Sequence, residues 1–237
     1  MEKGGCAAIV LAGGSGLRMG GAVPKQYLPL GDHTVLYEAL SSFEESPLID
    51  SIVVVGSKDT LDECKKAAAR ENSKVSCFVL GGKERYDSVY AGLLACEGAE
   101  VVLIHDGARP FCDGEIIRRC VEAARTYGAC AAGMPSKDTV KLTDAKGVVE
   151  DTPERSRVWI VQTPQAFRYD LIRRAHETLR EVGMAGVTDD AVMVERIGGV
   201  SVHMVEGSYS NIKLTTPEDM VVARALYAER HSSESSM

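Results

Sequence analysis

Residues 6–20 read CAAIVLAGGSGLRMG, an apolar run of strand length (6–12) followed directly by a glycine-rich loop. Glycines at these positions let the backbone approach a ligand closely and turn its N–H groups toward phosphate oxygens. The chain contains no Gly-x-x-x-x-Gly-Lys-Ser/Thr string, and Met19 stands where a dinucleotide fingerprint requires glycine. The stretch therefore predicts a phosphate cradle that differs from both of these familiar loops.

Further apolar runs alternate with helical segments along the chain. Strands are expected at 52–56, 75–80, 101–105 and 130–134. Helices are expected at 35–43, 60–69, 85–95 and 114–127. This alternation is typical of an α/β protein with a doubly wound, mostly parallel sheet. Ligands bind such sheets beyond the carboxyl ends of the strands, so the polar residues that follow each strand are the candidates for a site.

One segment departs from this alternation. Residues 137–142 and 148–151 resemble short strands joined by the loop TDAKG, which predicts a β-hairpin arm at about 137–158. A lone hairpin is marginally stable in water, so we expect the arm to pack against a second copy of the chain. The final helix is expected at 217–227, after Thr216 as N-cap. Residues 1–237 are expected to form a single domain with a disordered tail from about 231.

Charge and cysteine content exclude several classes of protein. The net charge is −7, so the chain lacks the broad cationic field that nucleic acids or anionic membranes require. Its seven cysteines show no zinc spacing, and a disulfide framework is not expected in a chain of this length. The longest apolar run near the N-terminus is too short for a signal peptide or a membrane span. We therefore expect a soluble, cytoplasmic protein without nucleic-acid or membrane partners.

Two cations lie close to the glycine loop, Arg18 within it and Lys25 after Pro24. Attack on a phosphoryl centre builds negative charge on its equatorial oxygens and on the leaving group, which Arg, Lys and Mg²⁺ usually offset. The alternative is a surface loop with incidental basic residues.

A second cluster, HDGARP at 105–110, follows the strand expected at 101–105. Asp106 occupies the strand end, where its carboxylate could bind a hydroxyl or a magnesium ion. Strand alternation turns His105 the other way, which favours a packed histidine. A hairpin turn at Asp-Gly is the alternative, but a helix follows instead of a returning strand.

A third cluster, GGKERYDS at 81–88, also leads from a strand into a helix. Gly82 and the helix N-terminus could receive an anion or a base edge, although a plain strand-to-helix turn carrying Ser88 explains the pattern equally well. Lys213 alternates with apolar neighbours in NIKL and so projects away from the core face. Taken alone, it is an ordinary exposed lysine.

In order along the chain, the motifs AGGSGLRMG, PKQYLPL, GGKERYDSV, HDGARP, KDT, QTPQ, VTDDA and NIKLTTPED resemble the 2-C-methyl-D-erythritol 4-phosphate cytidylyltransferase family of the non-mevalonate isoprenoid pathway. The resemblance covers about residues 6–227. It implies a Rossmann-like, GT-A-like nucleotidyltransferase that transfers CMP from CTP to methylerythritol phosphate and releases pyrophosphate. It also implies Mg²⁺, bound mainly through the CTP phosphates.

The resemblance implies a role for individual residues. The expected catalytic residues are Arg18, Lys25, Arg155 and Lys213. The expected nucleotide-binding residues are Ala12, Gly13, Gly14, Ser15, Gly16, Lys25, Gly82, Ser88 and Asp106. The expected substrate-binding residues are Asp106, Arg109, Thr139, Arg155, Thr163, Thr188 and Lys213, and Asp106 is also the expected metal ligand. Arg18 and Lys25 would stabilise the pentacoordinate α-phosphate, and Lys213 would position the acceptor phosphate.

The resemblance gives the arm a function in a homodimer, where it embraces a second subunit and sends an arginine into the partner's site. Arg155 stands at that position and is preferred to Arg157 by its distance to Trp159. Thr188 could instead be the N-cap of a helix that begins at Asp189. The chain departs from many relatives at Gly107, where alanine is common.

Two other functions remain open. Ribitol-5-phosphate cytidylyltransferase shares these motifs, and its acceptor also combines a phosphate with a polyol, so only one or two hydrogen bonds would separate the two enzymes. A CTP-binding module without turnover is the second alternative. It would have less need of transition-state cations such as Arg18, Lys25 and Lys213.

Overall fold

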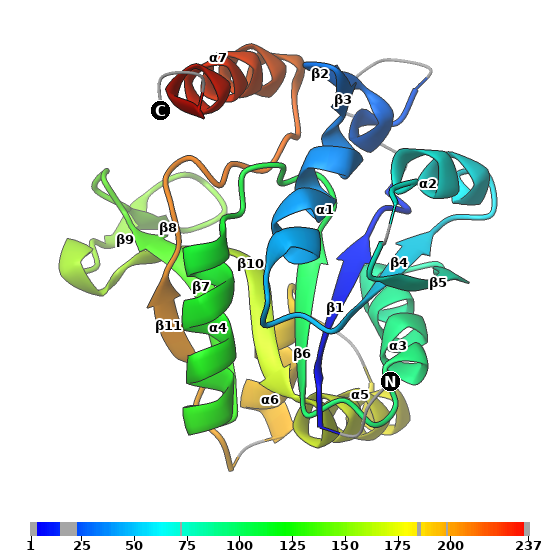
Figure 1. The fold of residues 1–237 in the computed structure, drawn as a ribbon. Coiled ribbons are helices and arrows are strands. Elements are labelled where there is room, and N and C mark those ends of the chain that lie inside the picture. The colour runs from blue at the N-terminus through cyan, green and yellow to red at the C-terminus, as the bar shows by residue number, and fades with distance from the viewer. Residues whose placement is uncertain (1–3, 15–22, 72, 184–185, 198, 235–237) are drawn as a thin grey trace.

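The computed structural model describes residues 4–14, 23–71, 73–183, 186–197 and 199–234, and a seven-stranded sheet forms its centre (Figure 1). The strand order is β11-β7-β10-β6-β1-β4-β5. These strands are β1 (Cys6–Leu11), β4 (Ser51–Gly56), β5 (Val75–Leu80), β6 (Val101–Asp106), β7 (Ala129–Pro135), β10 (Trp159–Arg168) and β11 (His203–Glu206). β10 runs antiparallel to both of its neighbours, whereas the other pairs are parallel. The predicted α/β fold with a mostly parallel sheet is confirmed.

Helices cover both faces of the sheet (Figure 1). They are α1 (Val35–Glu45), α2 (Leu61–Ala67), α3 (Arg85–Ala95), α4 (Gly114–Tyr127), α5 (Tyr169–Val182), α6 (Asp190–Ile197) and α7 (Pro217–Glu234). Ala8 and Val10 of β1 pack in the core beneath α1 and α4, while Ala7 and Ile9 pack on the side of α3 and α5. Successive side chains of a strand point to opposite faces, so burial on both faces explains why the strand sequences are continuously apolar.

Local sequence signals set the helix ends. The Asp113 carboxylate accepts a hydrogen bond of 2.8 Å from the Ile116 N–H at the start of α4. Gly128 ends the same helix with a φ of 92°, a left-handed conformation that favours glycine. Both α3 and α4 have the bounds expected from the sequence, because their caps and apolar periodicity agree.

The arm is less regular than expected. The strands predicted at 137–142 and 148–151 shrink to β8 (Leu142–Thr143) and β9 (Val149–Asp151), which pair antiparallel. The Asp144 carboxylate closes the turn between them by accepting from the N–H groups of Lys146 and Val148, each at 2.9 Å. The arm projects from the side of the sheet that carries β7 and β11 (Figure 1).

Two predictions about the C-terminal part were incomplete or wrong. The sequence patterns did not indicate β10, β11 or α5, and β10 was hidden because buried polar residues such as Thr163 and Gln165 interrupt its apolar pattern. The tail expected to be disordered from 231 is helical as far as 234, since α7 ends only at Glu234. The ring of His231 stacks on Tyr227, which favours this last turn.

Helix α7 positions the segment before it. Leu214, Met220 and Ala223 share a small buried cluster with Leu30 and Phe111. This cluster fixes the NIKL segment against the end of the sheet toward which β1 points (Figure 1). Among the described residues, no helix combines the length and apolar composition that a membrane span requires.

Candidate active site

A cavity of about 640 Å³ opens where the carboxyl ends of β1, β5 and β6 continue into loops. Its lining includes Gly13, Gly14, Lys25, Gln26, Gly82, Arg85, Ser88, Asp106 and Lys213. Leu11 at the end of β1 is in register with Asp106 at the end of β6. The sheet therefore brings Gly13 and Gly14, at the start of the glycine loop, close to Asp106 at the carboxyl ends of the strands, where the sequence predicted a ligand site.

Side chains of the 3₁₀ turn Lys25–Tyr27 donate hydrogen bonds to the main chain at the start of the glycine loop. The Gln26 amide nitrogen donates to the carbonyl oxygens of Ala12 at 2.6 Å and Gly14 at 2.8 Å. The Tyr27 hydroxyl donates to the same Ala12 carbonyl at 3.0 Å. The expected site residues Ser15, Gly16 and Arg18 lie outside the described residues.

The Asp106 carboxylate lies between two cations. Its Oδ2 is 2.7 Å from the Lys213 ammonium, and its Oδ1 is 3.6 Å from the Arg85 guanidinium. Burial alone would raise the pKa of Asp106, but Arg85 and Lys213 more than offset burial and hold the pKa well below its usual range. The carboxylate is therefore ionised at every pH at which the protein would work.

Lys213 is positioned by its neighbours in sequence. The N–H of Leu214 donates to the Ala108 carbonyl at 2.9 Å, and Leu214 is fully buried. The side chain of Asn211, also fully buried, donates to the Thr163 carbonyl at 2.9 Å. This segment is therefore fixed on both sides of Lys213, which places the lysine at the carboxyl end of β6, where its ammonium contacts Asp106.

Arg109 binds the main chain of the segment that contains Lys213. Its guanidinium donates to the Asn211 carbonyl at 2.7 Å, and only 9% of the residue is exposed. Burial lowers the pKa of Arg109 while Asp106 opposes that effect. The structure thus places this expected substrate-binding residue in contact with the protein main chain, where it supports Lys213.

An ion pair between the partly exposed Arg85 and the buried Asp190, which the sequence patterns did not indicate, lies next to Asp106. The Arg85 guanidinium is 2.8 Å from Oδ2 of Asp190, a carboxylate whose side chain is only 1% exposed. Burial raises the pKa of Asp190, and Arg85 opposes this shift. Both residues belong to motifs noted in the sequence, GGKERYDSV and VTDDA, but only the fold shows that their opposite charges meet.

Comparison with known proteins agrees with this geometry. The family model described as 2-C-methyl-D-erythritol 4-phosphate cytidylyltransferase matches residues 6–229. The chain belongs to this family. A curated member from Syntrophotalea carbinolica is 48% identical over 221 residues, covering 92% of this chain and 94% of the relative. Another from Clostridium botulinum (strain Eklund 17B) is 44% identical over 220 residues, covering 92% of this chain and 97% of the relative.

A solved structure has the same fold. The crystal structure of 4-diphosphocytidyl-2C-methyl-D-erythritol synthase from Anaerococcus prevotii superposes with a TM-score of 0.85 at 36% identity. The match covers 95% of this chain and 96% of that one. The family and the cytidylyltransferase class expected from the sequence motifs are therefore confirmed.

Within the cytidylyltransferase framework, Gly82 and Ser88 form the wall of the cavity at the end of β5. The Gly82 N–H donates to the Ser88 hydroxyl at 3.2 Å, and both residues line the cavity. The Asp87 carboxylate accepts from the Glu84 N–H at 3.3 Å at the start of α3. This helix terminus therefore already has one carboxylate partner from its own chain.

The three threonines expected to bind the acceptor substrate differ in their burial. The Thr163 hydroxyl is buried, accepts from the Asp106 N–H at 3.0 Å and lies 3.2 Å from Nδ1 of His105. His105 is itself fully buried, consistent with a packed histidine, and burial lowers its pKa to about 4. Thr139 and Thr188 are exposed. The alternative of Thr188 as N-cap is wrong, since α6 begins at Asp190 and the preceding Asp189 carboxylate accepts from the Val192 N–H at 3.1 Å.

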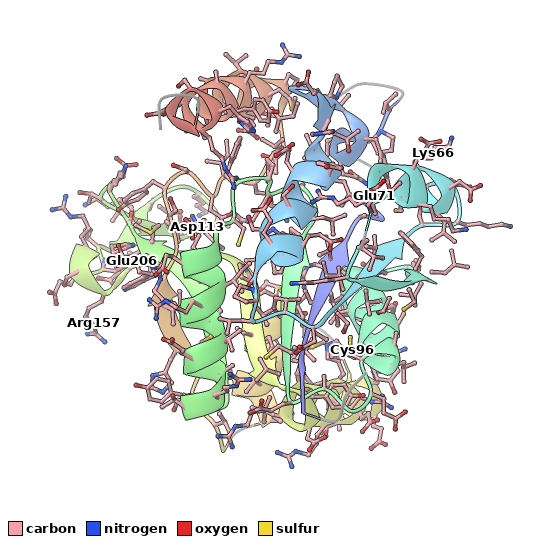
Figure 2. The ribbon with its side chains drawn as sticks, viewed as in Figure 1. Lys66, Glu71, Cys96, Asp113, Arg157 and Glu206 are labelled. Carbon is pink, nitrogen blue, oxygen red and sulfur yellow. The ribbon has the colours of Figure 1, made fainter. Side chains whose placement is uncertain are left out.

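Arg155 does not line this cavity in its own chain. It lies on the arm, exposed, with its guanidinium 3.5 Å from the Lys137 carbonyl oxygen. Arg157 points outward from the same 3₁₀ turn, Arg155–Arg157 (Figure 2). The structure therefore brings Lys25, Asp106 and Lys213 together and leaves Arg155 and Thr139 on the projecting arm.

The donor set suits a magnesium ion that is bound mainly by a substrate. Among the described residues, no group of three or more His, Cys, Asp or Glu side chains could hold a metal. Mg²⁺ commonly binds through one or two carboxylates together with substrate phosphates and water. Asp106, ionised and beside the glycine loop, fits that pattern.

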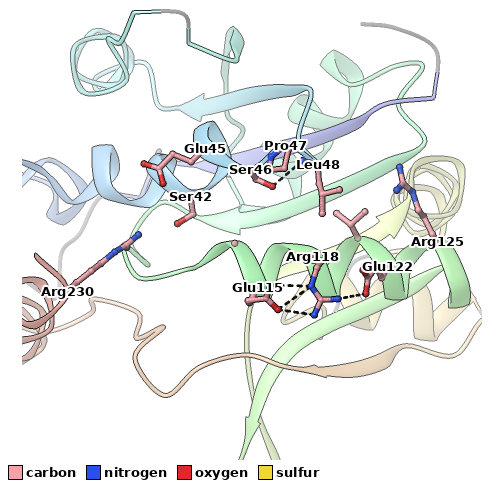
Figure 3. A pocket seen from close by; sticks show the side chains of 12 residues that line it. Ser42, Glu45, Ser46, Pro47, Leu48, Glu115, Arg118, Glu122, Arg125 and Arg230 are labelled. Carbon is pink, nitrogen blue, oxygen red and sulfur yellow. Dashed lines mark hydrogen bonds and ion pairs between the residues drawn. The ribbon is translucent and has the colours of Figure 1, made fainter. Parts of the chain in front are cut away.

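A second cavity, of about 510 Å³, lies between α1 and α4 (Figure 3). The Arg118 guanidinium in its lining is paired with Glu115 at 2.9 Å and with Glu122 at 2.7 Å. Of the residues that the structure describes, none that belongs to the motifs carrying the family resemblance contributes to this lining. We therefore assign the active site to the cavity at the strand ends.

Proposed function

We propose that the protein transfers CMP from CTP to 2-C-methyl-D-erythritol 4-phosphate, forming 4-diphosphocytidyl-2-C-methyl-D-erythritol and pyrophosphate for isoprenoid precursor biosynthesis. The observation that carries this proposal is the cluster of Lys25, Asp106 and Lys213 around the glycine loop in a chain of this family. The reaction involves no redox step and requires only groups that bind and stabilise phosphate.

The chemistry is an in-line displacement at phosphorus. An oxygen of the acceptor phosphate forms a bond with the α-phosphorus of CTP while the bond from that phosphorus to the bridging oxygen breaks. Pyrophosphate leaves with the electron pair. The attacking phosphate is already anionic at neutral pH, so no general base is required.

The cations of the cavity offset the charge that develops. Negative charge grows on the equatorial oxygens and on the leaving pyrophosphate, and preorganised Lys and Arg side chains stabilise it without reorganisation. Lys25 enters the cavity beside the glycine loop, and Lys213 enters it beside Asp106. Arg18 is assigned the same function as Lys25 on the family resemblance.

We assign two functions to Asp106. In the structure it holds the Lys213 ammonium at 2.7 Å, which orients the cation that would receive the acceptor phosphate. Its ionised carboxylate would also hold Mg²⁺ together with the CTP phosphates. When bound, that ion would supply further positive charge to the triphosphate.

The arm supports a homodimer. Leu142, Val148, Val149 and Ile160 are all at least 50% exposed on or beside it. Apolar side chains gathered on a projecting element favour association. We propose that the arms of two copies exchange and that Arg155 and Thr139 reach the acceptor in the partner's cavity.

The cysteines and the net charge support a cytoplasmic location and small-molecule partners. All seven cysteines are free thiols, which suits the reducing cytoplasm. The net charge of −7 favours small-molecule partners over nucleic acids and anionic membranes.

The decisive experiment is pyrophosphate release from CTP and Mg²⁺ with two acceptors compared side by side, methylerythritol 4-phosphate and ribitol 5-phosphate. We expect turnover with methylerythritol 4-phosphate and at most traces with ribitol 5-phosphate. Turnover with ribitol 5-phosphate alone would overturn the acceptor assignment, and binding of CTP without turnover on either acceptor would overturn the enzyme assignment.

A further inference from the structure

The side chain of Gln26 is buried beneath the start of the glycine loop. Only 2% of the residue is exposed, and its amide nitrogen donates to both the Ala12 and the Gly14 carbonyl oxygens, at 2.6 and 2.8 Å. A side-chain amide carries two N–H donors on one nitrogen, so this pair of bonds uses its full donor capacity. The loop is therefore fastened on both sides of Gly13.

These two bonds set the orientation of a peptide group in the cavity wall. In a trans peptide the carbonyl oxygen and the following N–H point to opposite sides. Because the Ala12 carbonyl is directed at Gln26, the N–H of Gly13 is directed away from it. Gly13 lines the cavity, and a Cβ at this position would lie 3.1 Å from the Ser57 nitrogen, so the backbone here is also closely packed from behind.

The same side chain is tied to Lys25. Gln26 follows Lys25 directly in the turn Lys25–Tyr27, which is closed by a 2.9 Å bond from the Tyr27 N–H to the Pro24 carbonyl. Tyr27 adds a second donor to the Ala12 carbonyl, at 3.0 Å. Because Gln26 directly follows Lys25 in this turn, its side-chain bonds link the main chain of Ala12 and Gly14 to the short backbone segment that carries Lys25.

We infer that Gln26 is a positioning residue that fixes Gly13 and Gly14 relative to Lys25, so that the backbone amides at the start of the glycine loop and the Lys25 ammonium bind the same triphosphate. This inference deepens the cytidylyltransferase function proposed above and rests on it. It assigns Gln26 no contact with the reacting atoms. Its effect passes through the main chain of Ala12 and Gly14 and through the neighbouring Lys25.

The test is Gln26→Glu, which keeps the shape of the side chain and replaces both donors with carboxylate oxygen. At pH 8 the ionised carboxylate would face two carbonyl oxygens and displace the loop. We expect KM for CTP to rise and kcat/KM for CTP to fall on the order of 10²-fold, the cost typical of a misplacement near 1 Å. KM for the acceptor should change much less.

The pH profile separates positioning from a purely structural function. At pH 6 a larger share of the Gln26→Glu variant is protonated at the introduced carboxyl and regains one donor, so its rate relative to wild type at the same pH should rise. Gln26→Met, which cannot regain a donor, should show the same deficit at both pH values. Dividing by the wild-type rate removes the titration of other groups.

A control variant tests whether any lost side-chain bond to the main chain has the same effect. Arg70→Met removes bonds from the guanidinium to the Tyr37 carbonyl and, at 2.8 Å, to the Ser41 hydroxyl, outside the cavity lining. It should lower the urea midpoint without changing KM for CTP.

Wild-type KM for CTP in both Gln26→Glu and Gln26→Met would overturn the inference while the wild-type enzyme remains active. If Gln26→Glu fails to fold, Gln26→Met carries the test through the same split between KM values. Failure of the proposed function is distinguishable, because the wild-type protein itself would then release no pyrophosphate.

Discussion

The Nζ atom of Lys213 lies 2.7 Å from Oδ2 of Asp106, although the two residues come from distant parts of the chain. The side chain of Asp106 is 12% exposed and that of Lys213 is 39% exposed, so water screens this ion pair only in part. Each partner is also fixed through its main chain, Asp106 by the Thr163 hydroxyl and the segment of Lys213 by the bond from Leu214 to Ala108. The cation that would receive the acceptor phosphate is thus oriented before any substrate binds.

Replacing Lys213 should therefore impair turnover more than folding. We expect Lys213→Met to lower kcat about 10²-fold or more, as for the loss of a preorganised charge that stabilises a transition state. Asp106 would still face Arg85, so the urea midpoint should change little. Pyrophosphate release at saturating CTP and acceptor measures the effect.

Lys66→Ala is the matched control, since Lys66 is an exposed lysine on α2 that pairs only with Glu63 among the contacts described (Figure 2). It should leave turnover unchanged. A Lys213→Met enzyme with wild-type kcat would contradict the function assigned to this lysine.

The parts of the site that lie at strand ends could be predicted from the sequence. The apolar runs locate the ends of β1, β5 and β6, and residues at or just after these ends, among them Gly13, Gly82 and Asp106, line one cavity. Parallel strands share a carboxyl edge, so their positions in sequence were sufficient to place them together.

The supporting contacts could not be predicted, because they depend on packing between distant segments. Arg85 and Asp190 meet only because α3 and α6 cover the same face of the sheet. β10, whose apolar pattern is interrupted by polar residues, lies between β6 and β7, and no local pattern indicated this position. Gln26 gives no local signal either, because its partners Ala12 and Gly14 are main-chain carbonyls.

We expect the ion pair between Arg85 and Asp190 to contribute to both the free energy of unfolding and the rate of turnover. Asp190→Asn leaves the Arg85 guanidinium, whose side chain is 32% exposed, without its buried partner at 2.8 Å. We expect a loss of roughly 2 kcal/mol, less than for a fully buried pair because water reaches Arg85. Arg85 would then approach Asp106 and compete with Lys213, so kcat should fall roughly 10-fold.

Urea unfolding and pyrophosphate release measure the two effects in parallel. Arg180→Gln is the control, since Arg180 pairs with Asp87 at 2.8 Å while its side chain is 38% exposed. That change should cost less than about 1 kcal/mol. Equal losses in both variants would show that burial of Asp190 adds nothing to its ion pair.

Stability should decrease in acid because of buried histidines. Burial lowers the pKa of His176 from 6.5 to about 3, so below pH 6.5 the unfolded state binds a proton that the folded state does not. The stabilisation is fully present above pH 6.5 and is lost as the pH falls toward 3, by up to about 1.4 kcal/mol per pH unit. His105 acts in the same direction down to its pKa of about 4.

His176→Phe should reduce this acid sensitivity. The ring is fully buried against Tyr90, and within the described structure neither of its nitrogens has a hydrogen-bond partner. The difference in unfolding free energy between pH 7.5 and pH 5 should shrink by roughly 2 kcal/mol. Urea midpoints at both pH values test this, with exposed His203→Phe as control, and an unchanged difference would rule out His176 as its source.

The arm allows the shared site to be tested by mixing two inactive proteins. If Arg155 completes the partner's cavity, Arg155→Ala and Lys213→Met should each have little activity alone. A mixed dimer of the two variants holds one intact site, because the chain with Lys213 receives Arg155 from its partner. Random exchange in an equal mixture should then restore about a quarter of wild-type activity, since half of the dimers are mixed and each has one working site of two.

If Arg155 served its own chain instead, no site in any mixed dimer would be complete and activity would not return. Arg157→Ala removes a positive charge from the same turn, two residues from Arg155. This variant should remain active by itself, which would show that activity depends on an arginine at position 155 and not on the total charge of the turn. Size-exclusion chromatography with light scattering checks that all variants remain dimeric. A monomeric wild type would rule out the shared site, because Arg155 on the projecting arm would then have no partner cavity to enter.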